Sequence, residues 1–295
     1  MKVIKADTLG FCMGVRRAVE TAVSAARDSK YPVFTLGRII HNPKVLSDLE
    51  NLGIKSIDES SLASCAALRH KDGAVIIRAH GISPQMEQLL RETCVCRVID
   101  ATCPNVKKNQ LKAQELSREG FNIFLAGEKE HAEITGLLGY CRGAPFCEVT
   151  GSAQEAQEKA SCLLKKNKDA KTALLGQTTI SPDEYAAAAK EIKKYFPSLL
   201  IISTICRATE ERRVALRALL EKTNAVIIAG GRESANTRRL YETALESGKP
   251  CVLAQNADDI PPEFFNFDTV GVCAGASTPD STIDEIENAL NRGCK

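Results

Sequence analysis

The sequence contains no tryptophan, and aromatic residues make up only 5% of its 295 positions. Proteins that bind single-stranded nucleic acid use aromatic side chains as stacking platforms, so this class is not favoured. A net charge of +2 provides no overall attraction to nucleic acid or to a membrane surface. No apolar run approaches the ~18 residues that a membrane helix needs, and the first four residues resemble a strand rather than a targeting segment. We therefore expect a cytoplasmic protein that binds neither nucleic acid nor membrane.

Cysteine, by contrast, is abundant, with 12 residues. In a reducing compartment this number does not indicate a framework of disulfides. No two cysteines have the spacing Cys-x-x-Cys, which argues against a zinc ribbon, a thioredoxin-like motif or a ferredoxin-type cluster. Most of the cysteines are interpreted as small buried hydrophobic residues.

Three cysteines share one sequence context, and one falls in each third of the chain. Each follows an apolar run typical of a strand and precedes a helical pattern. They are Cys12, Cys103 and Cys206. Cys12 also lies between two glycines, which allow the backbone to come close to a ligand. Our hypothesis is that the three thiols meet at one centre.

Strand and helix patterns alternate along the whole chain, which is typical of α/β proteins with mostly parallel sheets. We predict strands at 122–125 and 199–205 among others, a loop over 126–136, and no strand between the helix that begins at Lys44 and Ser60. Polar residues follow the strands, at the sheet edge where α/β proteins bind ligands. Three α/β lobes around a shared centre are expected, namely 14–102, 103–203, and 204–295 together with 1–13.

The histidines support a ligand site. Three of the four, His41, His80 and His131, follow predicted strands, whereas His70 lies in a charged turn. A lone histidine is more often a structural residue, but three in one topological position favour function. Ser234, Asn236 and Ser277 lie at predicted helix starts, where they are either ordinary caps or part of an anion site. Together these residues indicate a pocket for a phosphate-bearing ligand.

Three thiolates without a fourth partner suggest a particular metal chemistry. Cysteine thiolates are the usual ligands of iron–sulfur clusters. A [4Fe-4S] cluster held by three cysteines has one open iron, which can act as a Lewis acid and pass electrons. Zinc held by three thiolates and a water is the competing assignment.

Nine motifs in register resemble the LytB/IspH family of 4-hydroxy-3-methylbut-2-enyl diphosphate reductases. The similarity extends from Cys12 to Asp280. The motifs are Gly10-Phe11-Cys12-x-Gly14-Val15, His41-Asn42, Ala79-His80-Gly81, Asp100-Ala101-Thr102-Cys103-Pro104, His131-x-Glu133, Gln177-Thr178-Thr179, Cys206-x-Ala208-Thr209, Ser234-x-Asn236 and Ala274-Gly275-Ala276-Ser277-x-Pro279-Asp280.

The resemblance implies a three-lobed α/β fold around one [4Fe-4S] cluster bound by Cys12, Cys103 and Cys206. It implies reductive removal of the hydroxyl from an allylic diphosphate, giving isopentenyl and dimethylallyl diphosphate, the last step of the non-mevalonate (MEP) pathway of isoprenoid biosynthesis. A ferredoxin or flavodoxin is the implied electron donor. Glu133 is implied to deliver protons, through or beside Thr178, which would lie by the substrate hydroxyl. His131 is implied to lie near the diphosphate and to be the third catalytic residue. The residues implied to bind substrate are His41, His80, His131, Thr178, Ser234, Asn236 and Ser277.

Several positions differ from the family pattern without removing a ligand or the implied acid: Ala132, Thr135, Arg213 and Ala235. Without the resemblance, Glu133 would be interpreted as a solvated loop charge. Two other hypotheses stay open. One is a three-cysteine cluster dehydratase of the aconitase or quinolinate synthase type, which needs no reductant. The other is a non-enzymatic redox or zinc-binding protein.

Overall fold

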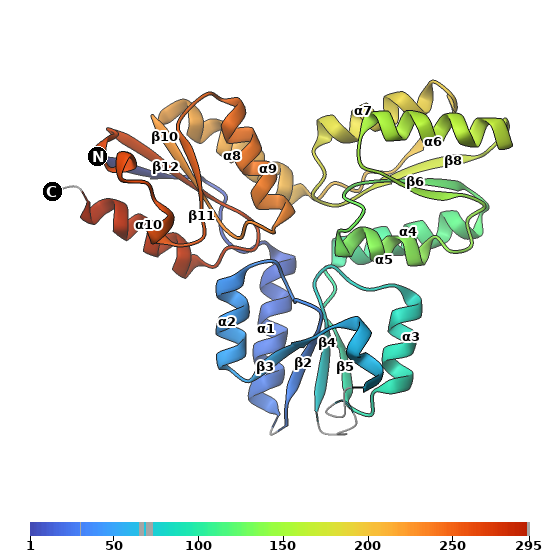
Figure 1. The fold of residues 1–295 in the computed structure, drawn as a ribbon, viewed down its shortest axis with the longest axis horizontal. Helices are drawn as coiled ribbons and strands as arrows, with labels where there is room; N and C mark the ends of the chain where they lie inside the picture. The colour runs from blue at the N-terminus through green and yellow to red at the C-terminus, as the bar shows by residue number, and fades with distance from the viewer. Residues whose placement is uncertain (30, 65–67, 69–72, 294–295) are drawn as a thin grey trace. The chain divides into compact units, whose positions relative to one another are not determined.

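Helices and strands alternate along the chain in the computed structural model, which describes residues 1–29, 31–64, 68 and 73–293 (Figure 1). The strands form three four-stranded sheets, and every pairing between described strands is parallel. His70, Cys65 and Cys294 lie outside the described residues. Each predicted lobe contains one of the sheets, and the predicted α/β class is confirmed. The residue bounds of the lobes stay a prediction.

The chain divides into two compact units, which are described separately. Unit 1 comprises Met1–Glu20, Ile40–Leu52 and Arg207–Lys295. It contains the sheet with strand order β1-β12-β10-β11. Its elements are β1 (Lys2–Lys5), α2 (Pro43–Asn51), α8 (Arg207–Lys222), β10 (Ala225–Ala229), α9 (Ala235–Glu246), β11 (Cys251–Ala254), the 3-10 helices η3 (Ala257–Asp259) and η4 (Pro262–Asn266), β12 (Thr269–Ala274) and α10 (Asp280–Arg292).

Both faces of the unit 1 sheet are covered by helices, which explains why its central strand β10 is apolar throughout. All five residues of β10 are buried. One face packs against α8 and α9 through residues such as Leu216 and Leu240, and the other packs against α10 through Ile283 and Ile286. A strand buried on both faces is a continuous apolar run, which is why the sequence pattern identified β10.

Unit 2 comprises Thr21–Ile39 and Gly53–Cys206 and contains two sheets, with orders β3-β2-β4-β5 and β7-β6-β8-β9. Helix α1 (Met13–Asp28) supplies residues to both units. The first sheet is built from β2 (Val33–Leu36), β3 (Ile54–Ile57), β4 (Ala74–Ile77) and β5 (Arg97–Asp100), with η1 (Glu59–Ser64) and α3 (Pro84–Thr93). The second is built from α4 (Pro104–Arg118), β6 (Asn122–Ala126), α5 (Ala132–Tyr140), β7 (Cys147–Thr150), α6 (Ala153–Lys166), β8 (Thr172–Gly176), α7 (Pro182–Lys193) and β9 (Leu200–Ile201).

The second sheet of unit 2 also has helices on both faces. Helices α6 and α7 pack on one face around Phe124 and Leu174. Helices α4 and α5 pack on the other, around Leu125 and Leu175. Neighbouring residues of one strand thus point to opposite faces, as the period of two in a strand requires. Among the described residues, no helix has the length and apolar character needed to cross a membrane.

Three sequence predictions about elements were wrong. The predicted loop over 126–136 contains the start of α5, whose Gly136 and Gly139 lower its helix propensity and hide the pattern. A Cβ at Gly139 would lie 2.2 Å from the Cβ of Ser83, so close packing requires that glycine. Strand β3 was missed because it is a partly exposed edge strand with two polar residues. The predicted strand over 199–205 is only two residues long.

Candidate active site

The residues predicted for the site lie at strand ends or in the first turn of the following helix, and they divide between the two units. Unit 1 holds Cys12, His41, Ser234, Asn236 and Ser277. Unit 2 holds His80, Cys103, His131, Glu133, Thr178 and Cys206. In parallel sheets, ligands bind at the edge formed by the carboxyl ends of the strands.

One loop of unit 1, directly after β12, joins Cys12 to Asn236. The backbone N–H of Cys12 donates a hydrogen bond to the carbonyl oxygen of Ala276 at 3.0 Å. The backbone N–H of Ala276 donates to Oδ1 of Asn236 at 2.9 Å. The backbone of Ala276 therefore links the turn that carries Cys12 to the start of α9.

Asn236 has a second polar group that the protein does not satisfy. Its side chain is 4% exposed, and Nδ2 has no hydrogen-bond partner among the described residues. A buried donor left without a partner costs free energy, typically about 1–3 kcal/mol. A ligand oxygen would relieve this cost, so the Asn236 amide fits a site for an anion.

His41 is held next to the same loop of unit 1. The hydroxyl of Ser277 donates to the carbonyl oxygen of His41 at 3.4 Å. Gly231 packs against that carbonyl so closely that a Cβ there would lie 2.6 Å from the oxygen. Ser234 caps α9 by accepting a hydrogen bond from the N–H of Thr237 at 3.4 Å. Unit 1 thus brings His41, Asn236 and Ser277 around one helix start, which favours anions.

A buried arginine, Arg212, supports the Cys12 turn from α8. Its side chain is 3% exposed. One guanidinium nitrogen donates to the carbonyl oxygen of Gly10 at 2.7 Å, and another donates to that of Ala208 at 2.9 Å. Arg212 therefore links the turn that precedes Cys12 to the first turn of α8.

Replacing Arg212 with methionine is expected to lower the free energy of unfolding by about 2–4 kcal/mol, because it leaves two carbonyl oxygens without their charged donor. Urea denaturation monitored by circular dichroism measures this change. Arg217→Met, at an exposed position of the same helix, is the matched control and should change stability by less than about 0.5 kcal/mol. Equal effects of the two substitutions would show that the buried hydrogen bonds contribute nothing specific.

Glu133 and Thr178 form the most deeply buried polar pair of the predicted set. Glu133 is 1% exposed, in the first turn of α5. Its two carboxyl oxygens lie 2.8 Å from the backbone nitrogen and 2.8 Å from the hydroxyl oxygen of Thr178. The interpretation as a solvated loop charge is therefore wrong. Burial is the main cause that raises the pKa of Glu133 to about 7, and the two contacts with Thr178 oppose it. The carboxyl group can hold a proton near neutral pH and release it.

Thr178 connects this acid to Cys206. The backbone N–H of Cys206 donates to the carbonyl oxygen of Thr178 at 2.8 Å. The side-chain amide of Asn105 donates to Sγ of Cys206 at 3.3 Å, and Asn105 lies two residues after Cys103. The backbone N–H of Cys103 donates to the carbonyl oxygen of Ala79 at 2.9 Å. Unit 2 therefore joins Cys206 to the acid and to the helix that begins after Cys103.

The two histidines of unit 2 are in contact. The rings of His80 and His131 meet edge to face, with centroids 5.3 Å apart. Nδ1 of His131 accepts a hydrogen bond from the N–H of Glu133 at 3.2 Å. A nitrogen that accepts carries no proton, so the ring proton of His131 lies on Nε2, which can donate to a ligand.

The three predicted cysteine ligands also share their local structure. Each is a half-buried thiol that directly precedes a helix, namely α1, α4 and α8. The positive end of a helix dipole stabilises a thiolate. The donor set therefore fits an iron–sulfur cluster, which needs deprotonated cysteines. Cys12 belongs to unit 1 and the other two to unit 2, so their meeting at one centre stays a prediction.

Asn105 and Arg212 were not identified from the sequence as parts of the site. Asn105 stands directly after the motif that contains Cys103, and its side chain could have been assigned to a neighbouring thiolate on that ground. Arg212 lies in an ordinary helical pattern with many charges. Nothing in that pattern separates a buried arginine from an exposed one.

The chain matches known sequences over almost its full length. Residues 3–291 match the family described as LytB protein. The 4-hydroxy-3-methylbut-2-enyl diphosphate reductase of Treponema denticola is 40% identical over 298 residues, covering 99% of this chain and 100% of that protein. The reductase of the same name from Aquifex aeolicus is 37% identical over 295 residues, covering 99% and 97%.

The fold is also similar to solved structures. The E-1-hydroxy-2-methyl-but-2-enyl-4-diphosphate reductase of Plasmodium falciparum matches with a TM-score of 0.87 and 27% identity, over 97% of this chain and 87% of that chain. A second structure, described as (E)-4-hydroxy-3-methyl-but-2-enyl diphosphate reductase, the terminal enzyme of the non-mevalonate pathway, matches with a TM-score of 0.72 and 35% identity. It covers 99% of this chain and 100% of that one.

Proposed function

Since the chain belongs to the LytB family, we propose that it catalyses the reaction for which its relatives are named, the reduction of 4-hydroxy-3-methylbut-2-enyl diphosphate. The products are isopentenyl and dimethylallyl diphosphate. Two electrons and two protons enter, the bond from carbon to the hydroxyl oxygen breaks, and the oxygen leaves as water. The observation that supports this chemistry most directly is the buried pair of Glu133 and Thr178, an acid with a pKa of about 7.

The cofactor expected for this family is an iron–sulfur cluster, and we propose one [4Fe-4S] cluster held by Cys12, Cys103 and Cys206. When bound, such a cluster supplies electrons and a Lewis-acidic iron that has no protein ligand. The hydrogen bond from Asn105 to Sγ of Cys206 is of the kind that tunes cluster potentials.

The protein's own contribution to the reaction is a proton and a fixed substrate position. Hydroxide is a poor leaving group, so the departing oxygen must be protonated. Glu133 in its acid form can donate to the hydroxyl of Thr178, which lies 2.8 Å away and can pass a proton on. The second Glu133 oxygen stays anchored by the Thr178 N–H. This anchoring keeps the acid in one orientation.

Substrate binding is proposed to depend on the diphosphate, with donors from His41, Ser234, Asn236 and Ser277. His80 and His131 are proposed to assist from unit 2. The unsatisfied Nδ2 of Asn236 supports this assignment. When these residues hold the diphosphate, the hydroxyl group at the other end of the substrate is also fixed in position, which is a proximity effect.

Replacing Ser277 with alanine is expected to raise KM about tenfold, because one hydrogen bond to a charged group contributes about 1.5–3 kcal/mol at most. Steady-state kinetics with varied diphosphate substrate measures this change, and kcat should fall less than KM rises. Ser281→Ala, at an exposed position four residues further on, is the control. An unchanged KM for Ser277→Ala would remove Ser277 from the binding site.

An anaerobic assay tests the proposed function. The protein is purified without oxygen and supplied with the allylic diphosphate and dithionite, and both reductant oxidation and products are followed. Two electrons consumed per product are expected. Turnover without reductant would instead indicate a dehydratase. A colourless protein with stoichiometric zinc and no turnover would support the non-enzymatic alternative.

The electrons must come from another molecule, and a ferredoxin or flavodoxin is proposed as the donor. Both are small acidic proteins that transfer one electron at a time. The cytoplasmic location expected from the sequence stays a prediction.

A further inference from the structure

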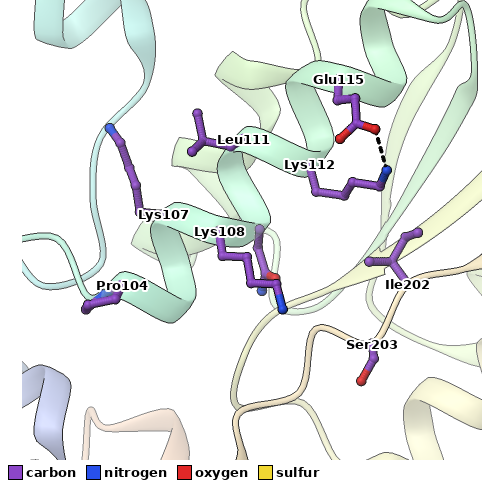
Figure 2. Close-up of a pocket in the computed structure, with 9 residues that line it drawn as sticks. Pro104, Lys107, Lys108, Leu111, Lys112, Glu115, Ile202 and Ser203 are labelled. Atoms are coloured by element: carbon purple, nitrogen blue, oxygen red, sulfur yellow. Dashed lines mark hydrogen bonds and ion pairs between the residues drawn. The ribbon is translucent and has the colours of Figure 1, made fainter.

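A groove in unit 2 lies between α4 and the segment that leads from β9 to Cys206. Its volume is about 710 Å³. Its walls include Lys108, Leu111, Lys112, Glu115, Ile202 and Ser203. Figure 2 shows the side chains of Lys108 and Lys112 directed toward the side of the groove that carries Ile202 and Ser203.

From this groove we infer the docking site of the electron donor, a small acidic redox protein. The inference rests on the proposed function, since only a reductase needs such a donor. Each carrier molecule gives up one electron, so two are oxidised for each substrate reduced. The substrate gains those two electrons and two protons, one forming a new C–H bond and one leaving in water.

The charge of the groove fits an acidic partner. Three lysines and one glutamate line it. Lys107 forms ion pairs outside it, with Asp100 at 3.6 Å and Glu87 at 3.8 Å. Lys108 is exposed, and among the described residues Lys112 forms its ion pair with the exposed Glu115, at 2.7 Å. An exposed pair of this kind contributes about 0.2–0.5 kcal/mol. A carboxylate of a docked partner can therefore compete for Lys112.

Apolar residues lie beside these charges. Leu111 on α4 is 53% exposed, and Ile202 on the opposite wall is partly exposed. Exposed apolar side chains within a charged rim are typical of surfaces that bind proteins. None of the described residues that line the groove is aromatic, which disfavours a stacked base or flavin ligand.

Both walls of the groove are connected to the segment that contains Cys206. Asn105, in the first turn of α4, donates to Sγ of Cys206. Asn109, which lines the groove, donates to the carbonyl oxygen of Thr204 at 3.2 Å. Ser203, on the other wall, precedes Cys206 by three residues. A partner seated here lies against Asn109 and Ser203, which connect the groove to the segment that contains Cys206.

A charge-reversed variant, Lys108→Glu with Lys112→Glu, tests the docking site. The holoenzyme is assayed with a purified bacterial flavodoxin of negative net charge, reduced by its NADPH-dependent reductase. We expect kcat/KM for the flavodoxin to fall about tenfold or more at low ionic strength, because like charges then oppose each other. Raising the salt concentration should lower the wild-type value and narrow the difference.

A second assay separates docking from catalysis. Dithionite with an uncharged viologen sulfonate delivers electrons without a protein partner, and here the variant should match the wild type in kcat and in KM for the diphosphate. Lys165→Glu with Lys166→Glu, on the exposed face of α6, should leave both assays unchanged.

Three results would overturn the docking site: no loss with flavodoxin, equal losses in the α6 variant, or a parallel loss with the viologen. If the wild type itself failed to reduce the substrate with the viologen, the proposed function would fail instead.

Discussion

Replacing Glu133 with glutamine is expected to lower kcat by about 100- to 10,000-fold, the usual contribution of a positioned acid. Glutamine has the same shape and can keep both contacts with Thr178, but its amide cannot donate a proton to a leaving oxygen. KM and cluster content should change little, because Glu133 is not a proposed ligand of the cluster or of the diphosphate. Single-turnover kinetics with the reduced enzyme measures the loss directly.

The neighbouring Glu130 offers a matched control. It lies three residues earlier, on the exposed part of the same connection between β6 and α5. Glu130→Gln should keep wild-type kcat, because the Glu130 side chain is exposed and has no proposed part in the proton transfer. If Glu133→Gln turned over at nearly the wild-type rate, another group would be the acid.

The pH dependence of the wild type provides an independent check on Glu133. Its protonated form is the active one, so kcat should fall as pH rises through the pKa of about 7, and the residual activity of Glu133→Gln should lack this decline. Stability should follow as well. Because the pKa rises from 4.5 to about 7 on folding, stability is lost as pH rises between these values, by about 3 kcal/mol. In Glu133→Gln this loss should be absent.

The α/β fold could be predicted because strands buried on both faces have an unbroken apolar pattern. β10 and β4 are of this kind, and every residue in them is buried. Elements that depend on tertiary contacts were missed because their apolar pattern is interrupted. The pattern of α5 is interrupted by Gly139, which the approach of Ser83 requires, and that approach is a property of the folded chain.

In the candidate site, too, the features that depend on local sequence could be predicted, and those that depend on tertiary contacts could not. The positions of Cys12, His41 and Ser277 at strand ends are local features that the sequence contains. The burial of Glu133 is not such a local feature. The spacing His-x-Glu is compatible with an exposed loop as well as with a helix start. Its raised pKa results from its removal from water in the folded chain, which the two hydrogen bonds from Thr178 only partly oppose. The spacing of residues in the sequence therefore could not predict the burial or the raised pKa of Glu133.

Replacing Cys103 with serine is expected to remove bound iron and to reduce activity to background. Serine is nearly the same size, so α4 should still begin at Pro104, but a hydroxyl does not ionise at neutral pH to replace a thiolate. Iron and sulfide per protein, together with the visible absorption of the anaerobically purified protein, measure the loss. Circular dichroism shows whether the fold persists, because metal binding can contribute to folding.

The same experiment asks whether the two units share one centre. Cys12→Ser alters unit 1 and Cys206→Ser alters unit 2, yet one cluster with three ligands requires both variants to lose iron as Cys103→Ser does. Cys162→Ser, at an exposed position of α6, should keep iron, colour and activity. A Cys12→Ser protein with full iron content and turnover would contradict the three-cysteine site, since unit 2 alone would then hold the cofactor. A shared cluster requires equal iron loss in all three variants, because each cysteine is one ligand of the cluster and the other two cannot replace it.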